Sequence, residues 1–435
     1  MKRYLYLWHR WLGIVACLFM ALWFISGVVM LYVGYPKLTP AEHLAHLPVL
    51  QLEPAPADLG QVLHAADPHQ PPTRIRLTTV AGQPRYILEY PGPRKVAVDS
   101  HSGQPAAPPD RVEALAAARQ FAPEAVARDR GVVQEDMWSL SRALDADRPL
   151  HRVAIADAER RLLYISGTTG EVVRDATASE RGWNWIGAWL HWLYPLRGIG
   201  IDGAWGPIVT YLSLAATLMA VLGLAVGVLR WRFKRTYRNG SHSPYQGFAR
   251  WHHLGGMLFG VLLITWIFSG LMSMNPWKLF SSAQPLSVAA YQGGPLGALA
   301  FPLNAGQVLQ RFADDGLQAR ELEWRMIAGK GYVIGYDGAG RTRIFDMAGD
   351  RVQRRFHPGT LQQAAWAIRP GQPMLVEQLA AYDFYYYARE PQSMMGHLQQ
   401  RLPVLRVRFD DPAHTWLHLD PVSYTHLTLP TNREV

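Results

Sequence analysis

Three apolar segments interrupt an otherwise mixed sequence, and each is long enough to cross a lipid bilayer. They run from Leu12 to Val33, from Pro207 to Leu229 and from Leu254 to Met274, and none contains a charged residue. About twenty consecutive apolar residues span the hydrocarbon core. The first segment is too long for a signal peptide and no small-residue cleavage pattern follows it, so we expect it to be retained. The pattern predicts a membrane protein.

The first and third apolar segments are copies of one another. At an offset of 243 residues, six identities align: Trp8, His9, Gly13, Trp23, Ser26 and Gly27 correspond to Trp251, His252, Gly256, Trp266, Ser269 and Gly270. Self-similarity at one fixed offset indicates an internal repeat. Each repeat is predicted to begin with a histidine at the foot of a membrane helix.

The long segments after the first and third spans show the same order of helix and strand patterns. In the first, a helix at 59–66 precedes strands near 74–79, 85–90 and 150–155. In the second, a helix at 305–312 precedes strands near 321–326, 332–336 and 405–411. Period-two alternation bounded by turn residues is typical of strands. The predicted fold class is an α-helical membrane protein with two outer α+β domains, a tandem repeat of span, domain and span.

The predicted boundaries follow from this repeat. They are 1–34 for the N-terminus and first span, 35–182 for the first outer domain, 183–230 for an amphipathic entry and the second span, 231–250 for a basic loop, 251–275 for the third span, 276–422 for the second outer domain and 423–435 for a tail. The repeat places a fourth span where the chain ends. We therefore expect the fourth span to be missing and the tail to be non-native.

The formal charge of +9 is concentrated beside the spans. Lys2, Arg3 and Arg10 precede the first span, and the loop between the second and third spans carries Arg230, Arg232, Lys234, Arg235, Arg238 and Arg250. Cationic loops stay in the cytoplasm. This predicts a multi-pass bacterial inner-membrane protein with a cytoplasmic N-terminus and periplasmic domains, and it indicates topology rather than nucleic-acid binding. The single cysteine, Cys17, excludes a disulfide framework and iron–sulfur ligation.

A histidine and a glycine share one face of the first span. At 100° per residue, Gly13 lies about 40° from His9, and glycine leaves room for a flat group beside the imidazole. His252 and Gly256 repeat the arrangement in the third span. Two such faces opposed can hold one haem between two axial imidazoles. The plainer alternative is an interfacial histidine with glycines that serve helix packing; the duplication favours the ligand hypothesis.

Two further histidines belong to this hypothesis. His253 points about 100° away from His252, so we favour His252 as the ligand and keep His253 as the alternative. His191 lies among tryptophans at the outer entrance to the second span, where it is either part of an aromatic belt or an outer ligand whose partner belongs to the fourth span. The remaining outer histidines, His43, His46, His64, His69, His101 and His151, are expected to be solvated surface residues.

These motifs carry a resemblance to a known family. The stretches 9–13 and 252–256, the Ser-Gly pairs at 26–27 and 269–270, the Leu190-His191 entry and the outer blocks 383–387 and 402–411 resemble the PepSY-associated transmembrane helix family over residues 1 to about 422. Members are mostly iron-regulated membrane proteins. The best-understood relatives look like ferrisiderophore reductases with four helices, two PepSY-type domains and two b-type haems. The resemblance implies His9 and His252 on an inner haem b and His191 on an outer one.

The predicted function is therefore electron transfer to a ferric siderophore or another iron chelate at the periplasmic face. The chain lacks a nicotinamide or flavin site, so a quinol or a cytoplasmic reductase is expected to supply the electrons. The alternative is a haem-free PepSY protein with a regulatory or peptidase-inhibitory binding role. Transport is disfavoured because no span carries buried charges or paired helix breaks.

Overall fold

The chain forms two compact units in the computed structural model, which describes residues 2–197, 201–280, 286–393, 396, 398, 400–412, 414–422 and 426–429. The helical unit comprises Met1–Val33 and Trp183–Ala283, and the sheet unit comprises Gly34–Gly182 and Gln284–Val435. Both halves of the repeat contribute to both units. Along the chain, segments of the helical unit therefore alternate with segments of the sheet unit.

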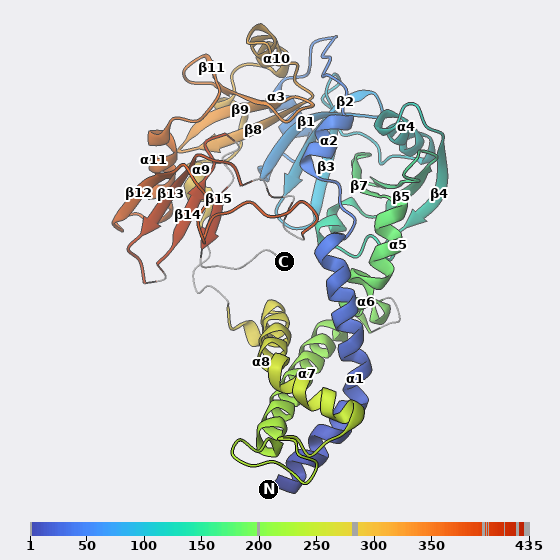
Figure 1. The fold of residues 1–435 in the computed structure, drawn as a ribbon. Helices are drawn as coiled ribbons and strands as arrows, with labels where there is room; N and C mark the ends of the chain where they lie inside the picture. Colours follow the sequence, from blue (N-terminus) through green and yellow to red (C-terminus); the bar gives the residue numbers. More distant parts are fainter. Residues whose placement is uncertain are drawn as a thin grey trace. The chain divides into compact units, whose positions relative to one another are not determined.

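Three long apolar helices make up most of the helical unit: α1 (Lys2–Tyr32), α7 (Asp202–Arg230) and α8 (Gly247–Ser273). Each is long and apolar enough to cross a membrane, which confirms the three predicted spans. All three begin before the predicted apolar segment, so His9 and His252 lie within helices rather than ahead of them. Helix α7 packs against both α1 and α8 (Figure 1).

Shorter elements complete the helical unit. They are α6 (Ala188–His191), η2 (Tyr194–Leu196) and η3 (Pro276–Lys278), while α5 (Ala178–Ile186) runs across the division between the units. Helix α6 packs on α1. This contact brings the predicted outer histidine to the first span.

The sheet unit contains six α-helices, two 3₁₀ helices and fifteen strands among its described residues. Its helical elements are α2 (Pro40–His46), α3 (Leu59–Ala66), η1 (Arg142–Asp147), α4 (Arg111–Phe121), α9 (Val288–Gln292), η4 (Ala298–Ala300), α10 (Ala305–Asp314) and α11 (Pro358–Ile368). Its first seven strands are β1 (Arg74–Val80), β2 (Gln83–Tyr90), β3 (Arg94–Asp99), β4 (Ala127–Val133), β5 (Leu150–Ile155), β6 (Leu162–Ser166) and β7 (Val172–Ala176). The others are β8 (Glu321–Ile327), β9 (Lys330–Tyr336), β10 (Thr342–Asp346), β11 (Arg351–Gln353), β12 (Met374–Leu379), β13 (Val404–Phe409), β14 (Trp416–Leu419) and β15 (His426–Leu429).

These strands form three antiparallel sheets. A central sheet of order β11-β10-β9-β8-β1-β2-β3 lies between a sheet of order β4-β5-β6-β7 and a sheet of order β12-β13-β14-β15 (Figure 1). The predicted outer domains are thus not separate bodies, because both outer segments supply strands to the central sheet. Of the tail 423–435, the structure describes only the backbone of β15, and the remainder lies outside the described residues.

The two halves meet where β1 pairs with β8. The register joins Ile75 to Trp324, Arg76 to Glu323 and Leu77 to Leu322. Since β1 and β8 occupy the same place in their repeats, this register relates the halves by an approximate two-fold axis through the Arg76–Glu323 pair. Strand pairing across the repeats covers an edge that each half alone would expose.

Apolar side chains on one face of the central sheet form the main core. Ile75, Leu77 and Trp324 pack with Val62 of α3 and Phe312 of α10, and all are essentially inaccessible to solvent. Helix α11 fills the space between the central sheet and the β12–β15 sheet. Helix α4 covers one face of the β4–β7 sheet through three alanines and Phe121.

The opposite side of β1 carries a buried network of charges. Arg76 donates to Glu321 at 3.0 Å and pairs with Glu171 at 2.9 Å, and all three residues are more than nine-tenths buried. Burial alone would raise the pKa of the Glu321 carboxyl, but Arg76 and a hydrogen bond with His43 outweigh it and lower that pKa. A buried charge without its partner is strongly destabilising, so Arg76 is central to the junction of the halves.

We expect Arg76→Met to destabilise the sheet unit by about 3–5 kcal/mol, because it leaves two buried carboxylates without their cation. Urea denaturation of the detergent-solubilised chain, followed by tryptophan fluorescence, measures the effect. The matched control is Arg311→Met, which removes an exposed pair with Asp350 and should cost less than about 1 kcal/mol. Equal effects of the two substitutions would refute the assignment.

The lowered carboxylate pKa values also determine whether the free energy of unfolding rises or falls as the pH becomes acidic. A folded-state pKa below the ordinary value of 4.5 gives stability that is present above pH 4.5 and is lost as the pH falls through the lowered value. The same loss should be smaller in Arg76→Met, in which the folded-state pKa of Glu321 moves upward. Denaturation repeated at acidic pH tests this.

Candidate functional site: histidines of the helical unit

His9 of α1 and His252 of α8 face each other across the helical unit. Their ring centroids lie 6.2 Å apart and the ring planes differ by 23°. Among the described residues, Nδ1 of His9 is buried without a hydrogen-bond partner. A buried polar atom without a partner calls for an explanation such as a ligand that has not been placed. The structure therefore brings together the two histidines that the repeat had paired.

Gly223 of α7 makes this approach of His9 possible. A Cβ added at Gly223 would lie 2.7 Å from Cε1 of His9, closer than real Cβ contacts allow. The imidazole thus rests directly on the backbone of α7. Any larger residue at position 223 must displace the ring or the helix.

The glycines that share a face with these histidines border open space. A Cβ added at Gly256 would meet nothing within 4 Å, and one at Gly13 would meet only the sulfur of Met219, at 4.0 Å. The prediction that these positions leave room beside the imidazoles is consistent with this geometry. Each position therefore has room for one added methyl-sized group.

His253 has a different environment from its neighbour. Its Nε2 donates to the carbonyl oxygen of Gly227 at 2.9 Å, so its Nδ1 must accept from the Ser243 hydroxyl at 2.7 Å. The ring is buried and lies edge-on to Trp231 and Tyr245. Because both nitrogens are already engaged, His253 fastens the basic loop to α7 and is poorly placed to bind a metal ion.

His191 ends α6 and lies against the far part of α1. Its Nδ1 is 3.0 Å from the Ser26 hydroxyl, which itself donates to the Trp23 carbonyl, so Nδ1 carries the proton and Nε2 does not. Gly27 admits the ring, because its added Cβ would lie 3.4 Å from Cε1 of His191. Burial lowers the pKa of His191, which favours the neutral imidazole. A neutral ring held through its other nitrogen is the usual form of a metal-binding histidine.

The two histidine sites lie at opposite ends of the helical unit. Seventeen residues of α1 separate His9 from Ser26, a rise of about 26 Å at 1.5 Å per residue. The hydrocarbon core of a bilayer is about 30 Å thick. The separation of the two sites is thus close to the thickness of that core.

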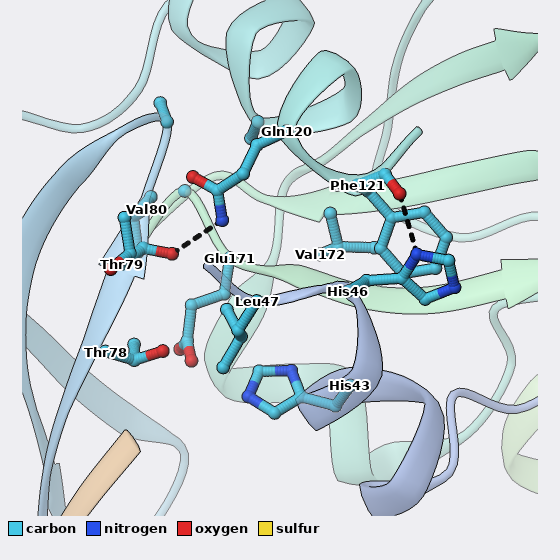
Figure 2. A pocket seen from close by; sticks show the side chains of 13 residues that line it. His43, His46, Leu47, Thr78, Thr79, Val80, Gln120, Phe121, Glu171 and Val172 are labelled. Carbon is cyan, nitrogen blue, oxygen red and sulfur yellow. Dashed lines mark hydrogen bonds between the residues drawn. The ribbon is translucent and has the colours of Figure 1, made fainter. Parts of the chain in front are cut away.

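Figure 2 shows a small cavity in the sheet unit, where His43, Thr78 and Glu171 approach one another. Its volume of about 20 Å³ suits a single water molecule. His43 is bound to Glu321 at 2.9 Å, and Glu171 to Arg76. The polar groups of this cavity thus belong to the charge network, and the described residues contain no cluster of three or more metal-ligating side chains.

The expectation that the outer histidines are solvated is wrong for three of them. His43 pairs with Glu321, His46 stacks on Phe121 and bonds its carbonyl oxygen at 2.7 Å, and His151 is buried with Nε2 3.1 Å from the Pro109 carbonyl. Their partners come from segments distant in the sequence. Local composition therefore could not reveal them.

Sequence reasoning also missed Gly223 and Ser26 as parts of the histidine sites. Gly223 and Gly227 are four residues apart in α7, a small-residue spacing that favours close helix contacts. That spacing could have indicated where another helix or a side chain approaches α7. Ser26 was noticed as a repeat identity, but nothing in the sequence joined it to His191.

Comparison with known proteins adds one match. The family model described as "PepSY-associated TM region" matches residues 6–368, which include all three long helices, His9, His191 and His252. Neither the curated proteins nor the solved structures contain a match to the chain.

We expect His253→Ala to destabilise the α7–α8 hairpin by about 1–3 kcal/mol, because it leaves the Ser243 hydroxyl and the Gly227 carbonyl without their partner. Thermal unfolding of the detergent-solubilised chain measures this. His64→Ala is the matched control, since that exposed ring of α3 has no side-chain hydrogen bond among the described residues. A loss for His64→Ala as large as that for His253→Ala would contradict the structural role of His253.

Proposed function

The chain belongs to the PepSY-associated TM region family, and from this premise we propose that it is a haem-containing membrane electron carrier. The observation that carries the proposal is the facing pair His9 and His252. His9 and His252 would hold the haem iron through imidazole nitrogens, which bind metal ions at roughly 2 Å. Their ring centroids lie 6.2 Å apart, and because the rings are stacked, each would turn to present a nitrogen to the iron.

The surroundings of the pair support a haem rather than a small ion. The described residues supply two imidazoles here and no cluster of three or more metal-ligating side chains, a donor set that would suit a b-type haem. Gly13 and Gly256 leave space beside the rings, and Gly223 fixes the position of His9. A bound haem would supply one-electron transfer through its iron, and the protein would contribute the ligands and the apolar surroundings.

His191 is proposed as a ligand of a second, outer haem b. The Ser26 hydroxyl orients its ring and leaves Nε2 free of the proton. Ligand sites near both membrane surfaces would allow electrons to cross the bilayer.

The cationic loop between α7 and α8 supports a cytoplasmic position for the inner site. Together with the N-terminal cations, it supports a topology with this end of the helices inside and the sheet unit in the periplasm of a bacterial inner membrane. We propose that a quinol or a cytoplasmic reductase donates the electrons. The proposed acceptor is a ferric siderophore or a similar chelate, in which one electron converts iron(III) to iron(II).

The test is the visible spectrum of the detergent-purified chain, oxidised and reduced, from cells supplied with haem. We expect sharp low-spin b-type bands, and His9→Ala and His252→Ala should each remove the same fraction of them. His242→Ala, a substitution of an exposed histidine in the basic loop, is the control and should leave the spectrum unchanged. A colourless protein would overturn the proposal and favour a haem-free regulatory or peptidase-inhibitory role.

A substitution that keeps both histidines tests whether the position of His9 matters. Gly223→Ala would place a methyl group against His9, so we expect a shifted or weakened inner-haem spectrum with the ligand still present. Gly206→Ala is the matched control in the same helix, because its added Cβ would meet nothing within 4 Å. Identical spectra for these two variants would contradict the placement of His9 on α7.

A further inference from the structure

An open hollow lined by arginines lies in the sheet unit, away from the histidine sites. It sits on the β4–β7 sheet and has a volume of about 540 Å³. Six arginines line it together with a few apolar residues and no acidic one: Arg128, Arg130, Arg152, Arg160, Arg161 and Arg181. Pockets for small ligands have volumes of about 300–1,000 Å³, so the hollow is large enough for one.

The sheet presents these arginines on the face opposite α4. Val153 and Ile155 of β5 point into the core beneath α4, so Arg152 and Ala154, which alternate with them, point the other way. Arg128 of β4 lies directly across from Ala154. The small side chain at position 154 forms a floor that the neighbouring arginines surround.

Several of these guanidinium groups have no acceptor on the protein. Within the described residues, the side chains of Arg128, Arg130 and Arg160 form no hydrogen bond or ion pair. Arg152 pairs with Asp136, and Arg161 pairs with Asp157, Glu159 and, through Nε at 3.8 Å, Asp175. Like charges gathered on one sheet face repel one another, and no described carboxylate pairs with Arg128, Arg130 or Arg160 to offset this repulsion.

The second repeat supplies an internal comparison. Arg406 of β13 corresponds to Arg152 and pairs with Asp383, as Arg152 pairs with Asp136. On the adjacent strand β12, however, the second repeat places Leu375 and Glu377 opposite Arg408 and Arg406, and Glu377 pairs with both arginines. The first repeat has Arg128 and Arg130 on the corresponding strand, β4. The same sheet face is thus neutralised in one repeat and strongly positive in the other.

We propose that this hollow binds a small, soluble polyanion through its carboxylate or phosphate oxygens. Guanidinium groups donate paired hydrogen bonds to such oxygens in a planar geometry that suits both. The arginines approach from β4, β5 and the turn before β6, so they can contact several oxyanion groups of one ligand. The inference does not depend on haem binding, because every residue that carries it belongs to the sheet unit.

Isothermal titration of the full detergent-solubilised chain at low salt tests the proposal, with citrate and inorganic pyrophosphate as probes. We expect at least one to bind, and Arg128→Gln with Arg130→Gln to weaken that binding by about tenfold or more. Added salt should also weaken it. The two arginines are exposed, so their substitution should leave the fold intact.

The matched control is Arg354→Gln with Arg355→Gln, which removes the same charge from two exposed arginines outside the hollow. It should leave affinity unchanged. Equal weakening by the two double substitutions would show a nonspecific charge effect and overturn the proposal. Failure of both probes to bind at millimolar concentration would also overturn it. So would binding of phosphatidylglycerol micelles alone, which would identify a lipid headgroup as the ligand.

Discussion

The pairing of β1 with β8 is the contact on which the sheet unit depends, and a buried charge network stabilises it. A strand junction between two repeats can slip, because a one-residue shift moves every side chain to the other face. Here Ile75 and Leu77 must enter the core while Arg76 must reach Glu321 and Glu171. A slipped register would bury the guanidinium among apolar side chains. The network therefore specifies the register as well as contributing to stability.

The two repeats have kept one backbone and changed its charges. At the axis, equivalent positions carry Arg76 and Glu323, so the halves are complementary rather than identical. On the outer sheets, the Asp136–Arg152 pair recurs as Asp383–Arg406, whereas Arg130 and Glu377 have opposite signs. A conserved scaffold with local reversals of charge gives each half its own surface. This divergence is what separates the arginine hollow from its neutralised counterpart.

The sequence predicted the three spans, several of the outer helices and strands, and the pairing of His9 with His252, but not the contacts between distant segments. Apolar length predicted the three spans, and the helix predicted at 59–66 coincides with α3. The repeat offset paired His9 with His252 before any geometry was known. The shared central sheet was not predictable, because strand propensity describes a strand and does not identify its partner. The same reason explains why the partners of His43 and His151 were missed.

The choice between the adjacent histidines His252 and His253 follows from helix geometry. Successive residues of a helix point about 100° apart, so one of two neighbouring rings can face α7 while the other faces α1. The His253 ring faces α7, and its two nitrogens are hydrogen-bonded to the Gly227 carbonyl and the Ser243 hydroxyl. That anchoring fixes the rotation of α8 about its axis. With the rotation fixed, His252 must point towards His9, so the structural histidine orients the one that we propose as a ligand.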